Sequence, residues 1–338
     1  MEQSKPRIEY VDLAKGFLII LVVLHHVDQE VFMFKDDTTR CFLSTFRMPL
    51  YYVLSGFFVS FKSGYRNFLE KKLNRLIIPF CFFVFLTNAY NLVLNRVWSG
   101  NFLHSDFVYE SPFYFAWTEN ISGNLLFQNG ALWFLVSLFE TYMLYLVINQ
   151  VCKGKIEWTL ALSLLLSVIG FYFKMPFYLD TSMTCLPFVV VGTMIRRYKL
   201  LEYCKNNVIR FGLALVCFGI ILLLHPDKFH FYRNDYEHDP IWMVWCCGVL
   251  GSVGILLFSS MMNKLPVVSY VGRYSIIVLG THAIFIPDLL ALTQRWMSVN
   301  VSILVSSIVV LAISILMIST LKRWVPKCVA QSDLIKFA

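Results

Sequence analysis

The sequence predicts an all-α, polytopic integral membrane protein, a bundle of about ten transmembrane helices with both termini in the cytoplasm. Three observations support this fold class. Hydrophobic residues make up 58% of the chain and charged residues only 15%, whereas a soluble domain carries about a quarter charged residues. Apolar runs of about 20 residues, the length of a helix that spans a bilayer, recur along the whole chain. Lysine and arginine collect in alternate connections between these runs.

Each apolar run is expected to form one spanning helix. No linker rich in Gly, Ser or Pro separates the runs, so we expect a single membrane domain over residues 1–338. The N-terminal part lacks a cleavage site of small residues, which indicates that the first run is retained rather than removed as a signal peptide. The ten runs are residues 11–33, 41–61, 74–95, 131–151, 157–174, 182–198, 208–225, 241–262, 268–290 and 300–321.

The connections between the runs carry a charge asymmetry. With the N-terminus in the cytoplasm, 21 of the 29 lysines and arginines fall on the cytoplasmic side, while acidic residues such as Asp28, Asp106 and Asp235 fall outside. The positive-inside rule therefore predicts cytoplasmic termini, and we expect a multi-pass protein of a bacterial inner membrane. The net charge of +8 favours contact with anionic lipid or an anionic cytosolic ligand. No nucleic-acid-binding module accompanies it.

The first run holds the most informative polar side chains. Ionisable groups inside a membrane span are costly, and function is the usual explanation for them. Lys15 and His26 are eleven residues apart, almost three helical turns, so they share one stripe with Ile19 and Val22. His25 is turned away by about 80° and is expected to be structural. A cation at the cytoplasmic mouth and an imidazole about 16 Å deeper would line one path.

This first-run motif resembles that of the membrane-bound acyltransferase 3 family, above all its fucose O-acetylase-like branch. The family has an Arg or Lys, ten intervening residues and a His, and Asp12 matches the acidic residue one turn before the cation. Four later segments are similar to family motifs in the same order. One departure is Arg47, which stands where this branch usually has His. The segments are FRMPLYYVLSGFF (46–58), KKLNRLIIPF (71–80), ALWFLVSLF (131–139) and VGRYSIIVLGTH (271–282).

The resemblance implies an O-acyltransferase that moves an acyl group, most simply acetyl from acetyl-CoA, to a hydroxyl of a cell-surface carbohydrate or its lipid-linked precursor. Such a reaction needs a base, and a neutral imidazole suits this role near neutral pH. It also needs charge stabilisation at the tetrahedral intermediate. His26 is the expected base, and Lys15 with Asp12 is expected to organise the inner end of the path.

The acyl donor is expected to meet a cluster of cations on the cytoplasmic side. Coenzyme A is anionic, and Lys71, Lys72 and Arg75 supply positive charge at the start of the third run. These cations also have a simpler interpretation, because every polytopic membrane protein needs such residues to set its topology. The sequence leaves both interpretations open.

Five further residues are candidates for the acceptor site, and each has a structural alternative. Arg47 could reach the outer headgroups, Ser55 could permit close helix packing, and Glu140 could belong to a buried ion pair. Trp133 lies seven residues before Glu140 and hence on the same helix face. His282 is either a polar site residue or a packing contact.

Two outer segments and the cysteines complete the analysis. The aromatic residues of 96–130 predict an interfacial belt, with a platform for sugar rings as the alternative. The stretch 225–239, HPDKFHFYRNDYEHD, predicts a solvated polar loop. Its spacing matches no metal-ligand pattern, and we expect no metal. The nine cysteines are scattered and read as small core residues rather than a disulfide framework.

A transporter or flippase for an anionic or glycan substrate is the main alternative function. Intramembrane His, Arg and Glu would suit proton coupling. Transporters often have repeated halves and broken helices, and this sequence has no such symmetry. A membrane-embedded sensor or scaffold is a further alternative, for which the chain offers no positive feature.

Overall fold

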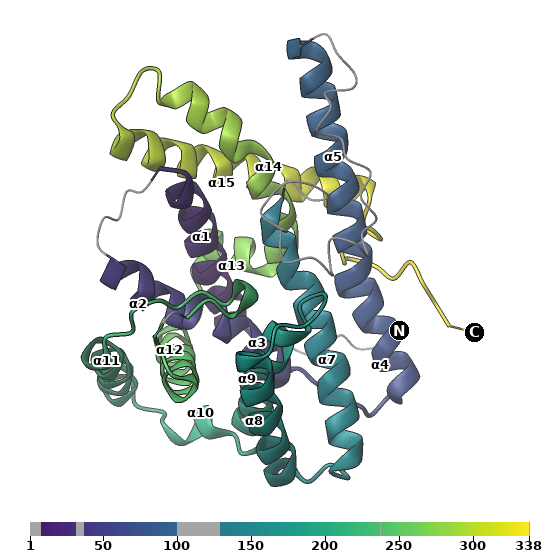
Figure 1. The fold of residues 1–338 in the computed structure, drawn as a ribbon, viewed down its shortest axis with the longest axis vertical. Coiled ribbons are helices and arrows are strands. Elements are labelled where there is room, and N and C mark those ends of the chain that lie inside the picture. Colours follow the sequence, from purple (N-terminus) through teal and green to yellow (C-terminus); the bar gives the residue numbers. More distant parts are fainter. Residues whose placement is uncertain (1–7, 32–36, 100–128, 237, 338) are drawn as a thin grey trace.

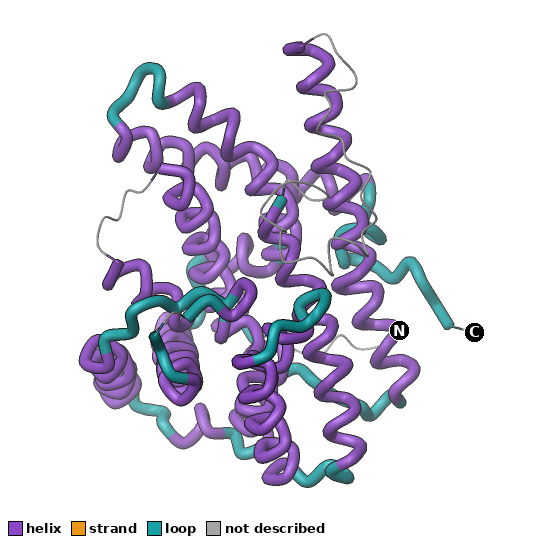
Figure 2. Tube along the Cα trace, viewed as in Figure 1, coloured by secondary structure: helices purple, strands orange, loops and turns teal. Residues whose placement is uncertain are grey.

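A computed structural model describes residues 8–31, 37–99, 129–236 and 238–337. Within these ranges the chain forms helices joined by loops and no strand, apart from an isolated bridge between His230 and Asp235 (Figure 2). The all-α class predicted from the sequence is therefore confirmed. Each of the ten predicted runs contains a helix, with ends that differ from the prediction by a few residues.

The helices follow one another along the whole described chain (Figure 1). Four of the predicted runs are each divided into two helical pieces, namely 41–61, 74–95, 131–151 and 268–290. The elements are α1 (Glu9–Val31), α2 (Asp37–Arg47), α3 (Pro49–Phe57), α4 (Tyr65–Lys72), the π-helix η1 (Leu73–Ile77), α5 (Ile78–Ser99), η2 (Gly130–Leu132), α7 (Trp133–Val151), α8 (Ile156–Tyr172), α9 (Leu179–Arg197), α10 (Leu200–Tyr203), α11 (Asn207–Leu224), η3 (Tyr232–Asn234), α12 (Ile241–Met262), α13 (Pro266–Arg273), α14 (Ser275–Thr293) and α15 (Val299–Trp324).

Seven helical segments of the described chain are long and apolar enough to cross a membrane. α8 is apolar but only 17 residues long. α9 is long enough but begins with fully buried polar residues, which lower its mean hydropathy. The second predicted run is divided into α2 and α3, and each of these helices is too short to cross a membrane alone. The count of ten spans therefore stays a prediction. The seven segments are Glu9–Asp28, Tyr65–Asn91, Gly130–Val151, Asn207–Leu224, Ile241–Met262, Ser275–Thr293 and Val299–Trp324.

The outer surfaces of these helices are apolar. Leu223 of α11 is 86% exposed, and Phe85 of α5 and Leu316 of α15 are each about 70% exposed. Apolar surface of this extent is unfavourable in water and favourable against lipid tails. Together with the seven span-length segments, it makes the chain a multi-pass membrane protein.

α1 lies at the centre of one half of the bundle and packs against α12, α13, α14 and α15 (Figure 1). Its contact with α13 depends on two glycines. A Cβ atom on Gly16 would collide with the backbone of Val268, and one on Gly272 would collide with the carbonyl of Asp12. Small residues let two membrane helices approach this closely, so α1 is held in a defined position.

The helix of the second predicted run is broken between Arg47 and Pro49. Proline has no N–H to donate and its ring collides with the preceding turn, so it is favoured in the first turn of a helix and disfavoured in the interior. Pro49 accordingly begins α3, and Met48 separates α3 from α2. α3 then packs closely on α9, because Gly56 and Gly192 have no side chains that would separate the two backbones. The break presents Arg47 to the interior.

Candidate active site

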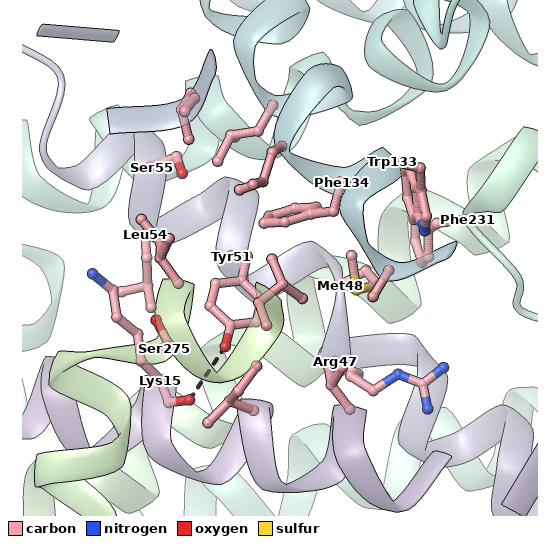
Figure 3. Close-up of a pocket in the computed structure, with 18 of the residues that line it drawn as sticks. Lys15, Arg47, Met48, Tyr51, Leu54, Ser55, Trp133, Phe134, Phe231 and Ser275 are labelled. Carbon is pink, nitrogen blue, oxygen red and sulfur yellow. Dashed lines mark hydrogen bonds between the residues drawn. The ribbon is translucent and has the colours of Figure 1, made fainter. Parts of the chain in front are cut away.

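A cavity of about 360 Å³ lies inside the bundle. Its walls come from α1, from the α2–α3 break, from η1, from α7, from the start of α14 and from the loop between α11 and α12. Figure 3 shows part of this lining, with Lys15 and Arg47 on opposite sides of the view and Tyr51 between them. The polar and charged lining residues are Lys15, His25, His26, Ser44, Arg47, Tyr51, Ser55, Lys72, Arg75, Trp133, Tyr142, His230, Tyr232 and Ser275.

One end of the cavity is lined by cations. The Lys15 Nζ lies 5.6 Å from the centre of the Phe58 ring, and the Lys72 Nζ lies 3.3 Å from the centre of the Tyr142 ring. Arg75 forms an ion pair with Asp333 of the C-terminal segment at 3.4 Å. The position of Arg75 depends on η1. A π-helical turn contains one extra residue and therefore rotates the side chains that follow it around the helix axis.

The predicted stripe of α1 faces this cavity. Lys15, Ile19, Val22 and His26 all line it, as their spacing requires. The Tyr51 hydroxyl donates a hydrogen bond to the Lys15 carbonyl at 3.3 Å (Figure 3), which ties α3 to this stripe. The cation and the imidazole therefore line one continuous cavity, about 16 Å apart along the helix axis.

The expectation that His25 points elsewhere is wrong. His25 also lines the cavity, and its ring lies 5.6 Å from that of His26 and 6.3 Å from that of His230, measured between ring centres. The loop before α12 closes over α1 at this end, so the cavity reaches more than one face of the helix. The spacing of residues on α1 alone cannot predict where that loop packs.

His282 is fully buried behind His26. The two rings are 5.1 Å apart between their centres. The Nδ1 atom of His282 bonds the Val278 carbonyl at 2.9 Å, and its Nε2 atom has no hydrogen-bond partner among the described residues. Because Nδ1 faces a carbonyl, it is the nitrogen that carries the proton. His282 thus contacts His26 without lining the cavity itself.

Arg47 stands at the end of the cavity remote from Lys15. Its side chain is only 6% exposed and donates a hydrogen bond to the Ser44 hydroxyl at 3.2 Å. Trp133 and Ser55 also line the cavity, in agreement with their choice from the sequence.

The remaining predicted site residues lie outside the lining. Glu140 accepts a hydrogen bond from the Ser182 hydroxyl of α9 at 2.7 Å, two turns along α7 from Trp133. Lys71 is exposed on the outside of α4. Asp12 is buried at the start of α1, where α13 packs against its backbone. The structure therefore brings His26, Lys15, Lys72, Arg75, Arg47, Trp133 and Ser55 together, but not these three residues or His282.

The loop at 225–239 is not the solvated polar loop that its composition predicts. Phe229 and Phe231 are each 2% exposed, and His230 and Tyr232 line the cavity. The buried carboxylate of Asp239 accepts the backbone N–H groups of Asp227 and Lys228, both at 3.1 Å, and so closes the loop. Alternating aromatic side chains supply enough apolar surface to drive this fold-back. The described residues include no cluster able to hold a metal ion.

His230 titrates differently from a histidine in water. Burial lowers its pKa below the usual value of 6.5, and the Arg47 cation is the second cause. At neutral pH its imidazole is therefore uncharged.

Tyr51, Tyr142, His230 and Ser275 are lining residues that the sequence analysis did not select. Tyr51 lies in the segment 46–58 that resembles a family motif, a signal that could have identified it. The other three come from separate elements, and only packing brings them to the cavity. The aromatic segment at 96–130 falls mostly on residues 100–128, outside the described residues.

The fold and cavity define a polytopic membrane protein with an internal chamber, lined by three cations at one end and by Arg47 and three histidines at the other. Residues 8–319 match the family described as acyltransferase domain. The chain belongs to this acyltransferase 3 family and is a membrane acyltransferase. Neither a curated protein nor a solved structure gives a significant match.

Proposed function

We propose that the protein transfers an acetyl group from cytosolic acetyl-CoA to a hydroxyl of a cell-surface carbohydrate or lipid-linked glycan precursor, as a member of the fucose O-acetylase-like branch. One observation carries this proposal. A single cavity joins the cations Lys15, Lys72 and Arg75 to His26. An anionic thioester entering at one end could therefore meet an imidazole base near the other.

The cationic end suits the nucleotide part of coenzyme A. Lys72 and Arg75 line the cavity and can contact phosphate directly, whereas exposed Lys71 would act only as a charge at a distance. The extended arm of the donor is comparable in length to the rise of about 16 Å from Lys15 to His26. Asp333, now paired with Arg75, would have to give way to phosphate.

In the proposed reaction, His26 accepts the proton of the acceptor hydroxyl. The acceptor hydroxyl oxygen attacks the thioester carbon while the neutral imidazole takes its proton. A carbon–oxygen bond forms, the carbon–sulfur bond breaks, and the proton passes to the leaving sulfur. Asp12, buried against α13, would hold the start of α1 and thereby Lys15, rather than touch either substrate.

The proposal includes an arrangement in the membrane. One domain over residues 1–338 would cross a bacterial inner membrane ten times, with α2–α3 as a broken span and both termini in the cytoplasm. Support comes from the basic residues near the cationic end of the cavity, which match the positive-inside rule.

The proposal is tested by incubating the purified protein with labelled acetyl-CoA and a membrane glycan extract. We expect label in the glycan and release of free coenzyme A in equal amounts. Uptake of unmodified glycan into vesicles, without label transfer, would contradict the proposal and favour a transporter.

A further inference from the structure

The charges that line the cavity are one-sided. Four cations and three histidines face it, and no carboxylate does, among the described residues. The cations Lys15, Lys72 and Arg75 are at the end where an anionic donor would enter. Arg47 lies on the opposite side of the chamber (Figure 3). The phosphates of the donor therefore do not explain Arg47.

Burial of Arg47 requires an explanation. A guanidinium has five N–H donors, and the described residues satisfy it with the Ser44 hydroxyl as hydrogen-bond acceptor. Arg47 is 94% buried. Burying its charge costs much free energy unless an opposite charge lies beside it.

Arg40, two turns earlier on α2, shows how an arginine of this chain is neutralised when its role is structural. Its guanidinium pairs with the buried carboxylate of Asp28 at 2.9 Å. No such carboxylate serves Arg47 in the described part of the chain. The difference indicates that the opposite charge of Arg47 arrives with a ligand.

The surroundings of Arg47 select the kind of ligand. The imidazoles of His25, His26 and His230 and the rings of Trp133 and Tyr232 form the same end of the cavity. Burial first, and the Arg47 cation second, lower the pKa of His230, so the guanidinium acts on this end of the cavity. This end offers one strong anion-binding group, neutral hydrogen-bonding rings and flat aromatic walls.

We propose that the acceptor carries an oxyanion group, a carboxylate or a phosphate, and that Arg47 binds it in the two-point geometry that guanidinium favours. This inference rests on the proposed function and specifies its acceptor as an acidic glycan or a phosphate-bearing one. Binding at Arg47 would present a neighbouring hydroxyl to His26. The residue would then determine specificity, and a neutral sugar would be a poor substrate.

The test compares three acceptors that differ in one group: a methyl hexopyranoside, the corresponding methyl hexuronoside and the corresponding 6-phosphate. The wild-type protein should show at least about tenfold higher kcat/KM for one of the two anionic acceptors, and the preferred one identifies carboxylate or phosphate. Arg47→Gln should lower kcat/KM for that acceptor by about 10–100-fold and reduce its preference over the neutral acceptor to about threefold or less. Arg47→Lys should restore part of the preference, and Arg197→Gln, a surface control, should keep it.

Two results would overturn the inference. One is a wild-type protein without preference among the three acceptors. The other is an equal loss by Arg47→Gln on neutral and anionic acceptors in a protein with unchanged melting temperature, which would assign Arg47 to the transition state instead. If Arg47→Gln does not fold, Arg47→Lys and the wild-type preference still decide the question.

A binding measurement separates this inference from the proposed function. Quenching of tryptophan fluorescence, with Trp133 in the cavity wall, reports binding of the hexuronoside or the phosphate without any transfer. Binding that depends on Arg47 without transfer would refute acyl transfer and keep the anion site. Transfer to the anionic acceptors without dependence on Arg47 would keep acyl transfer and refute the anion site.

Discussion

His26 carries the strongest prediction at the scale of single residues. It lines the cavity on the same stripe as Lys15 and contacts the ring of buried His282. Loss of a positioned general base costs about 10²–10⁴-fold in rate. We expect His26→Ala to lose acyl transfer by this factor while acyl-CoA affinity stays within about threefold, measured by label transfer and by equilibrium binding.

The control for this substitution is His238→Ala, because His238 is exposed and lies outside the cavity lining. His25 is unsuitable, since it faces the cavity. Full activity of a well-folded His26→Ala protein would exclude His26 as the base.

His230 provides a prediction about pH. Its pKa is lower in the folded protein than the usual 6.5, so protonation favours the unfolded chain. The stability that depends on neutral His230 is complete above about pH 6.5 and declines as the pH falls below that value. The melting temperature of the wild-type protein should therefore fall relative to that of His230→Gln as the pH is lowered from about 7.5 to about 5.5. The groups that act on His230 are Arg47, Asp235 and Lys228, with the ring of His25 nearby.

A parallel fall of both melting curves over this pH range would contradict the assignment. His230→Gln keeps a polar side chain of similar size, so packing changes little. The comparison also cancels the contributions of the other histidines.

At the scale of elements, the α1–α13 contact positions the Lys15 end of the catalytic stripe. Gly272→Ala would drive a methyl group into the carbonyl of Asp12. Overpacking of this kind costs about 1–3 kcal/mol and exceeds the gain of about 1 kcal/mol from replacing a helical glycine. We expect a lower melting temperature and a reduced transfer rate.

Gly212→Ala on α11 is the matched control, because nothing lies within 4 Å of the added atom. It should leave the melting temperature unchanged or raise it. The same loss from both substitutions would show that the close contact is not the cause.

One side chain of η1, Asn74, makes three hydrogen bonds to the backbone of the C-terminal segment. The Oδ1 atom of fully buried Asn74 accepts the backbone N–H groups of Leu334 and Ile335 at 2.7 and 2.9 Å, and its Nδ2 atom donates to the Ile335 carbonyl at 2.8 Å. Asn74→Ala should speed hydrogen exchange at both amides by about tenfold or more. Mass spectrometry of the C-terminal peptide measures this change.

Asn67→Ala is the control for this element, since the amide of exposed Asn67 bonds only within its own turn. Unchanged exchange in Asn74→Ala would mean that the Arg75–Asp333 ion pair holds the segment instead.

At the scale of the whole molecule, membrane orientation is the testable quantity. The alternation of cations predicts cytoplasmic termini and an external loop between α11 and α12. Reporter fusions after residues 68 and 338 should give cytoplasmic signals, and a fusion after residue 235 an external one. A fusion with the opposite signal would place the cationic end of the cavity away from cytosolic acetyl-CoA and remove the basis of the proposed donor path.

Much of this protein follows from local sequence. Length and hydropathy of the apolar runs determine helices, because a backbone in lipid must satisfy its own hydrogen bonds. The eleven-residue spacing of Lys15 and His26 determines that they share a face, since helical periodicity is a property of the chain itself. Family resemblance, carried by short motifs along residues 8–319, identified the acyltransferase class.

Other features depend on contacts between segments distant in the chain, and only the tertiary structure decided them. The loop at 225–239 folds inward because its aromatic rings find apolar partners on other helices, which its own composition does not reveal. That fold-back brings His25 and His230 to the cavity. Glu140 bonds Ser182 of α9, and Asp12 is buried where its backbone packs on α13. Neither residue lines the cavity, because neighbouring helices offer buried polar groups a partner or a packed position. The sequence thus determined which residues share a helix face, and tertiary packing decided which faces contact one another or line the cavity.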